Sequence, residues 1–119
     1  MGAECYYIED NILIIAKQNR TTIGVIGMRA PSYKRPFAEL DLLFIDNHFI
    51  GQGYGKELWN KAKDIAQELK WDSFRFISDQ LPEVIGFYEK MGAKIVKHLS
   101  FNTGCFPMME YILPKPELS

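Results

Sequence analysis

Three glycines stand one residue apart in the stretch Ile50-Gly51-Gln52-Gly53-Tyr54-Gly55-Lys56. Glycine allows the backbone to approach a ligand closely and to adopt a positive φ at little cost. The stretch follows an apolar, strand-like run, Leu40 to Ile45, and precedes a helix-like run that reaches about Lys70. The first amides of a helix have no partner within the helix, and its dipole favours negative charge there. The glycine loop is therefore a candidate phosphate-binding site.

The glycine spacing fits neither common nucleotide-binding fingerprint. A dinucleotide-binding loop reads G-x-G-x-x-G, whereas Gly51, Gly53 and Gly55 form G-x-G-x-G. A Walker loop ends in G-K-[ST], but here Glu57 follows Lys56. On the glycines alone, a phosphate loop and a flexible turn are equal alternatives.

A second motif, Phe87-Tyr88-Glu89-Lys90-Met91-Gly92, ends a later helix-like run. The two motifs, in this order and context, resemble those of the GCN5-related N-acetyltransferase (GNAT) family. The acetyl-CoA loop of that family is commonly written Q/R-x-x-G-x-G/A, and its later helix carries F-Y-E-K-x-G. By the order of elements, the resemblance covers roughly residues 12 to 113.

The hydrophobic pattern and the turn residues predict the elements around these motifs. We expect strands over 12–18, 22–29, 39–46, 73–77, 94–98 and 108–113, and helices over 54–70 and from Pro82 to Gly92. Gly24 and Gly27, inside the second strand, indicate a close approach of another element. The order β-β-β-α-β-α-β-β predicts a sheet with both antiparallel and parallel pairs.

The resemblance implies an α/β (α+β) fold with a mixed, splayed central sheet flanked by helices, as one acetyl-CoA-binding domain over residues 1–119. The strands that begin at Glu39 and Ser73 would separate, and the pantetheine arm of acetyl-CoA would pair with the open strand edge. Loop amides would bind the pyrophosphate. The implied cofactor-binding residues are Leu43, Phe44, Ile45, Ile50, Gly51, Gln52, Gly53, Tyr54, Gly55 and Lys56.

Tyr88 matches the tyrosine of the family motif, which implies that it donates a proton to the departing thiolate. A phenol with a pKa of ~10 can fill this role if it is held near the sulfur. The alternative is structural, because Val84, Phe87, Tyr88 and Met91 form a helical apolar stripe. In that case Tyr88 is a core tyrosine. We favour the catalytic interpretation.

Glu39 is a candidate general base, because it lies six residues before Ile45, the spacing of the base glutamate in the histone-acetylating branch of the family. Strand alternation predicts that Glu39, Asp41, Leu43 and Ile45 share one face, which makes Asp41 a rival. Alternatively, Glu39 only solvates the start of a strand. The backbone amide of Phe44 or Ile45 would polarise the thioester carbonyl.

The chain departs from the family pattern within its motifs. Ile50 stands where glutamine or arginine is usual, and Leu81 stands where an asparagine often contacts the pantetheine. Gln52 could supply a donor in the first case, and Asp79 or Gln80 in the second.

The family usually places a strand and two helices before the first hairpin, where the helices wall the acceptor site. Here only Met1 to Asp10 precede Asn11, so we expect a GNAT-like fold that is shortened at the N-terminus and lacks this strand and these helices. The acceptor site is then either open or completed by another chain, and an uncovered apolar face favours a homodimer.

The composition is that of an ordinary globular domain, with 119 residues, 47% hydrophobic residues and a net charge of -1. No global field would attract nucleic acid or an anionic membrane, so we expect neither partner. Cys5 and Cys105 match no metal spacing, and two free thiols in a reducing cytosol are favoured over one disulfide. With no signal sequence or membrane-length run, we expect a cytoplasmic protein.

The main functional interpretation is an acetyl-CoA-dependent N-acetyltransferase in which a primary amine of a small molecule or peptide attacks directly, without an acyl-enzyme. One alternative is a non-catalytic CoA-binding sensor or partner subunit. Another is an interaction domain that has lost the ligand. A peptide N-terminus, a lysine, a polyamine and a drug-like amine all stay open as acceptors. Lys34 and Arg35 form either a solvated turn or a basic loop that favours an acidic acceptor.

Overall fold

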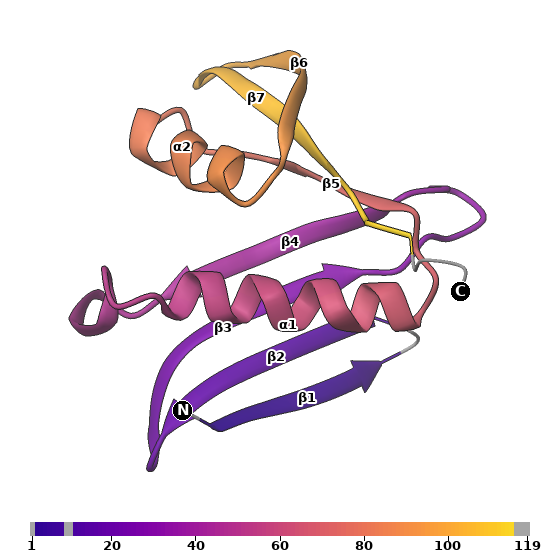
Figure 1. Cartoon of the computed structure of the whole chain (residues 1–119). Helices are drawn as coiled ribbons and strands as arrows, with labels where there is room; N and C mark the ends of the chain where they lie inside the picture. The colour runs from indigo at the N-terminus through magenta and orange to yellow at the C-terminus, as the bar shows by residue number, and fades with distance from the viewer. Residues whose placement is uncertain (1, 9–10, 116–119) are drawn as a thin grey trace.

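A computed structural model describes residues 2–8 and 11–115 as one seven-stranded sheet with two α-helices (Figure 1). The sheet order is β1-β2-β3-β4-β5-β7-β6, in which β4 and β5 run parallel and the other neighbours antiparallel. The predicted mixed sheet is therefore confirmed. The elements are β1 (Gly2–Ile8), β2 (Asn11–Gln18), β3 (Thr21–Arg29), β4 (Ala38–Ile45), the 3₁₀ helix η1 (Asn47–Phe49), α1 (Tyr54–Glu68), β5 (Ser73–Ile77), α2 (Pro82–Lys90), β6 (Lys94–Phe101) and β7 (Gly104–Ile112).

The first strand, β1, was not predicted. It pairs antiparallel with β2, from Gly2 opposite Lys17 to Ile8 opposite Asn11. Its sequence lacks the alternation of a half-buried strand, because β1 lies at the edge of the sheet and buries little of its surface. Only residues 9 and 10 separate β1 from β2, too few for a helix. The structure thus supplies the front strand that we expected to be missing, with no helix between these two strands.

The last two strands form a longer hairpin than predicted. Pairing continues to Phe101 opposite Gly104, through residues that we assigned to a loop. Proline normally interrupts a central strand because it donates no ladder hydrogen bond. Pro107 lies beyond the last β5–β7 pair, Ile77 opposite Met108, where the ladder on that side has ended, and its carbonyl accepts a bond from the Ser78 amide, at 3.0 Å. A φ of +132° at Gly104 closes the turn.

Helix α1 lies across β2, β3 and β4 and buries its apolar side on them (Figure 1). Trp59 of α1, 1% exposed, stands at the centre of this core. Its ring lies 5.2 Å from that of Phe74 in β5 and 5.9 Å from that of Tyr88 in α2, centroid to centroid. Both α-helices therefore share one core, on one face of the sheet. We call the opposite face the outer face.

None of the described helices is long and apolar enough to cross a membrane.

Strands β4 and β5 separate soon after they begin. They pair only through Ala38 opposite Phe74 and Glu39 opposite Arg75. On its other edge, β4 stays paired with β3 as far as Ile45 opposite Gly24. The edge of β4 that faces β5 is thus open from residue 40 to residue 45, and the predicted splay is confirmed (Figure 1).

A β-bulge in β4 overturns one prediction about its faces. Gly27 lies opposite Leu42 and Met28 opposite Leu40, so Asp41 is an extra residue on β4. Before the bulge, Leu40 is buried in the core; after it, Leu43 packs on the core and Leu42 is 45% exposed. Glu39 therefore does not share a face with Leu43 and Ile45, because the extra residue reverses the alternation.

Candidate active site

The glycine loop owes its shape to backbone conformation. Gly51 and Gly53 have φ values of +85° and +87°, which disfavour any residue with a Cβ. Neither Cβ position has an atom within 4 Å, so steric crowding is not the reason for glycine. Gly53 caps α1 without a side chain, and the first helical bond runs from the Glu57 amide to the Gly53 carbonyl, at 3.1 Å. The amides of residues 54–56 have no acceptor within the helix and are available to an anion.

The third glycine, Gly55, has a packing role. A Cβ on Gly55 would lie 3.4 Å from Cζ of Phe87 and 3.9 Å from Cγ1 of Ile45. This residue thus lets the start of α1 approach α2 and β4. Two of the three glycines are explained by their φ, and the third by close contact.

A cavity of about 480 Å³ lies between the end of β4, the glycine loop and α2. Eight of the ten predicted cofactor-binding residues line it, and Phe44 and Gln52 do not. Gln52 donates from Nε2 to the His48 carbonyl, at 3.3 Å, so its side chain braces its own loop. Phe44 is 56% exposed on the outer face. Any contact from Phe44 to a ligand in the cavity would come from its backbone. The full lining is Leu43, Ile45, Phe49, Ile50, Gly51, Gly53, Tyr54, Gly55, Lys56, Val84, Phe87 and Tyr88.

These features fit the chemistry of acetyl-CoA. The open β4 edge offers backbone groups to an extended amide-containing arm, and the cavity walls beside it are largely apolar. At the end of the same cavity, the free amides of α1 face the position that a pyrophosphate would take. Sequence reasoning did not assign Phe49, Val84 or Phe87 to the site, because an apolar residue in a loop or on a helical stripe carries no signal for a cavity wall.

Tyr88 joins the core and the cavity. Its ring packs 4.5 Å from that of Phe76, centroid to centroid, and the residue also lines the cavity. Burial raises the pKa of the Tyr88 phenol, and the negative charge of Asp79 raises it further. The phenol is therefore protonated at neutral pH. The structural and catalytic interpretations are thus compatible, since one face of the ring is core and the residue reaches the ligand space.

The two residues offered in place of the family asparagine make other contacts. Gln80 donates from Nε2 to the Cys105 carbonyl, at 2.7 Å, and so ties the start of α2 to β7. Asp79 accepts a bond from the Leu81 amide, at 3.2 Å, through Oδ1. Gln80 is already committed, whereas Asp79 influences the site through its charge on Tyr88.

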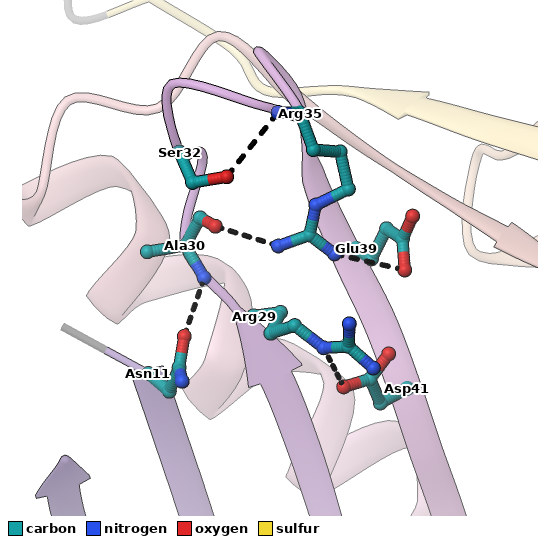
Figure 2. Close-up of polar contacts among 7 residues, drawn as sticks. All are labelled: Asn11, Arg29, Ala30, Ser32, Arg35, Glu39 and Asp41. Atoms are coloured by element: carbon teal, nitrogen blue, oxygen red, sulfur yellow. Dashed lines mark hydrogen bonds and ion pairs between the residues drawn. The ribbon is translucent and has the colours of Figure 1, made fainter. Parts of the chain in front are cut away.

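Glu39 and Asp41 are both paired with arginines (Figure 2). Nη1 of Arg35 lies 3.0 Å from Oε2 of Glu39, close enough for an ion pair but without the angle of a directed hydrogen bond. Nε of Arg29 donates to Oδ2 of Asp41, at 2.7 Å. Sequence reasoning missed both arginine partners: β3 brings Arg29 across to Asp41, whereas Arg35 lies in the loop only four residues before Glu39.

The two carboxylates line a second hollow of about 220 Å³, where β4 and β5 begin to separate. We call it the fork hollow; its lining is Phe37, Glu39, Leu40, Asp41, Arg75, Phe76, Ile77 and Met108. Tyr88 lines the 480 Å³ cavity instead, so the structure does not bring the predicted acid and base into one hollow.

A family model described as an acetyltransferase (GNAT) domain matches residues 3–112. The chain belongs to the GNAT acetyltransferase family. The peptidyl-lysine N-acetyltransferase YjaB of Salmonella typhimurium (strain LT2) is 32% identical over 77 residues, which are 63% of this chain and 50% of that protein. The chain thus spans about half the length of this curated relative.

Solved GNAT structures share the fold. An aminoglycoside 6′-N-acetyltransferase complexed with coenzyme A superposes with a TM-score of 0.78 at 21% identity, over 92% of this chain and 77% of that one. A chain of the NatC complex bound to Gag peptide and CoA superposes with a TM-score of 0.72 at 20% identity, over 87% of this chain and 71% of that one. The predicted GNAT-like fold is confirmed.

Proposed function

We propose that this GNAT chain transfers the acetyl group of acetyl-CoA to a primary amine by direct attack. The observation that carries the proposal is the single cavity that joins the open β4 edge to the free amides of α1. Coenzyme A has an amide-containing arm that ends in a pyrophosphate, and this cavity offers complementary groups in that order. Family membership supports the same cosubstrate.

In the proposed reaction, the neutral amine nitrogen attacks the acetyl carbonyl carbon, so that a C–N bond forms and the C–S bond breaks. Tyr88 donates its phenolic proton to the leaving sulfur, and Glu39 accepts, through a chain of water molecules along the open edge of β4, the proton that the amine loses. Oε2 of Glu39 faces Arg35, which leaves Oε1 for this role. The backbone amide of Phe44 or Ile45 polarises the carbonyl.

The acceptor amine approaches through the fork hollow, from the side opposite the cofactor cavity. A peptide acceptor is favoured by the relative named a peptidyl-lysine N-acetyltransferase. A small-molecule amine is the other candidate, since a structural neighbour is named an aminoglycoside acetyltransferase. We also expect the cytosol as the compartment, where the exposed free thiols of Cys5 and Cys105 are stable.

We further propose that two copies associate through the outer face of β1–β4. Tyr6, Leu13, Gly27 and Leu42 form one cross-strand row, and Ile15, Val25 and Phe44 belong to the next. None of the described helices covers this apolar patch. A second copy on it would bury the patch and wall one side of the acceptor approach.

The experiment that tests the cosubstrate is a calorimetric titration of acetyl-CoA into the chain and into two variants. Gly53→Asp and Gly53→Asn have nearly the same shape, and asparagine and aspartate tolerate a positive φ better than most residues. The aspartate adds a negative charge beside the phosphate position. We expect it to bind acetyl-CoA about tenfold more weakly than the asparagine variant. Absence of binding to the folded wild type would instead support the interaction-domain alternative.

A non-catalytic CoA-binding subunit is the second candidate function. The observation that favours it is Ile50, 63% exposed at the cavity wall where the family motif carries a polar residue. A broad amine panel separates the two functions: binding of acetyl-CoA without transfer to any amine would favour the subunit.

A further inference from the structure

The loop between β3 and β4 encloses a third hollow, of about 380 Å³, beside the acceptor approach. We call it the basic hollow; its lining is Asn11, Arg29, Ala30, Pro31, Ser32, Lys34 and Arg35. The ion pairs of Figure 2 form the wall that it shares with the fork hollow. Arg29 and Arg35 line the basic hollow, whereas their partners Asp41 and Glu39 line the fork hollow.

The loop that carries these cations is held in place by its own hydrogen bonds. Nη2 of Arg35 donates to the Ala30 carbonyl, at 2.8 Å, and the Arg35 amide donates to Oγ of Ser32, at 3.2 Å. Oδ1 of Asn11 accepts from the Ala30 amide, at 2.9 Å (Figure 2). The hollow therefore exists before a ligand arrives, which lowers the entropic cost of binding.

The carboxylates that the structure describes around the two hollows are already paired with arginines. Glu39 and Asp41 each hold an arginine, and Glu110 holds Arg75 at 2.8 Å. Lys34 is exposed and has no ion-pair partner among the described residues. Among the described residues, four cations thus face three carboxylates here. An acceptor that carries an anionic group gains Lys34 as a partner.

The geometry also sets the distance between that anion and the reacting amine. Four to five residues of β4 separate Glu39 from the backbone at Leu43 and Phe44, or about 13–16 Å at about 3.3 Å per residue. The bulge at Asp41 shortens this span. The path between runs along the open edge of β4, beside Ile77, which is 50% exposed. At the same rise an extended peptide covers about 13–16 Å in four to five residues, and the one-residue bulge reduces this number to three to four.

From these observations we propose that the acceptor is an acidic peptide, whose carboxylate side chain binds in the basic hollow three to four residues from the acetylated lysine. The proposal rests on the proposed acetyl transfer. Arg29 supplies its two terminal nitrogens, because the pair with Asp41 uses Nε. Lys34, which has no ion-pair partner in the described part of the chain, supplies an ammonium in the lining of the hollow.

The test compares three peptides with blocked termini and one lysine each. The first has aspartates three and four residues away on both sides, the second has asparagines there, and the third has the same aspartates next to the lysine. We expect kcat/KM for the first to exceed that for the second by about five- to tenfold, and to exceed that for the third. Added salt should reduce the preference. Equal values for the first two peptides would overturn the proposal, as would acetylation of other amines but of no peptide.

Two lysine variants show where the acidic peptide binds. Lys34→Glu should bring the ratio between the first and second peptides close to one. Lys61→Glu makes the same charge change on the exposed side of α1 and should leave the ratio unchanged. A loss of preference in both variants would point to net charge and contradict the assigned hollow.

Fluorescence anisotropy measures direct binding of the peptides in the presence of CoA. This measurement distinguishes a failure of acetyl transfer from a failure of the basic hollow to bind the peptide. If no amine is acetylated, the proposed function fails. The basic hollow still stands if the acidic peptide binds more tightly than the asparagine peptide and Lys34→Glu removes the difference. If the two peptides bind equally, the hollow is not an acceptor site.

Discussion

At the residue scale, Tyr88 serves both the core and the proposed chemistry. Burial gives it a raised pKa and a rigid ring, and the same placement brings it to the cofactor cavity. A proton donor to a thiolate must be protonated before the bond breaks, and burial maintains that state. The carboxylates are arranged differently, because each is held by an arginine.

Tyr88→Phe should lower kcat by about 10²–10⁴, the usual contribution of general acid–base catalysis. The dissociation constant of acetyl-CoA should change much less, because the aromatic ring remains. Steady-state kinetics and calorimetry measure the two effects. Tyr111→Phe is the matched control, since Tyr111 is also mostly buried but does not line the cavity. Equal turnover in wild type and Tyr88→Phe would remove Tyr88 from the mechanism.

The raised pKa of Tyr88 also predicts a pH dependence of stability. A phenol whose pKa is higher in the folded state than its unfolded value of ~10 stabilises the fold fully below that value. The contribution is lost as the pH rises through the folded pKa. The test compares the tyrosinate absorbance of the wild type and of Tyr88→Phe in a pH titration. The difference between the two curves belongs to Tyr88 and should therefore appear only above pH ~10. A Tyr88 step at or below pH 10 would contradict the burial effect.

At the element scale, the edge and the faces of β4 organise the site. β3 pairs with one edge from Glu39 to Ile45, while β5 leaves the other edge after two residue pairs. The bulge at Asp41 turns Leu43 and Ile45 toward the cofactor cavity and leaves Glu39 on the outer face. The strand thereby presents cofactor contacts on one side and acceptor contacts on the other.

Two glycines of β3 provide a test of this packing. A Cβ on Gly24 would lie 2.5 Å from the carbonyl oxygen of Phe44 and 2.7 Å from Cδ1 of Ile45, whereas a Cβ on Gly27 would meet Leu42 at an ordinary 3.6 Å. Gly24→Ala should therefore cost about 1–3 kcal/mol of unfolding free energy, the usual cost of overpacking. Gly27→Ala should be nearly neutral. Urea denaturation of both variants checks the difference, and equal stabilities would show that β4 can shift freely.

At the scale of the whole molecule, the sheet has one covered face and one face whose apolar residues meet no described helix. The covered face holds the core and the cofactor cavity. The outer face carries the fork hollow, the basic hollow and the apolar patch of β1–β4. Acceptor binding and association with a second copy would therefore occur on the same side of the molecule.

The proposed dimer predicts a specific response to a charge in the patch. Ile15→Lys should weaken association by at least about tenfold, because a buried lysine is costly at an apolar interface. Ile112→Lys is the matched control, since Ile112 lies in β7, outside the patch, and is 70% exposed. Sedimentation velocity at micromolar concentration measures both. A monomeric wild type under these conditions would contradict the dimer.

Most elements were predictable because their signals are local. The apolar stripe of α1 and the glycine loop before it are each contained in a few consecutive residues. The prediction for Gly24 was correct, and that for Gly27 was not, because the neighbouring strand approaches only the first of them closely. Strand β1 was missed because an edge strand buries too little surface to impose an alternating pattern.

The sequence by itself determined the family, the order of the elements after β1 and the two motifs that border the cofactor cavity, because these depend on short runs of residues. Tertiary structure alone decided which side of β4 each residue faces, which arginine holds each carboxylate, and how the loop before β4 forms a basic hollow. A one-residue bulge reverses the faces of a strand, and the Arg29–Asp41 pair joins two strands. Neither feature leaves a signal in local sequence.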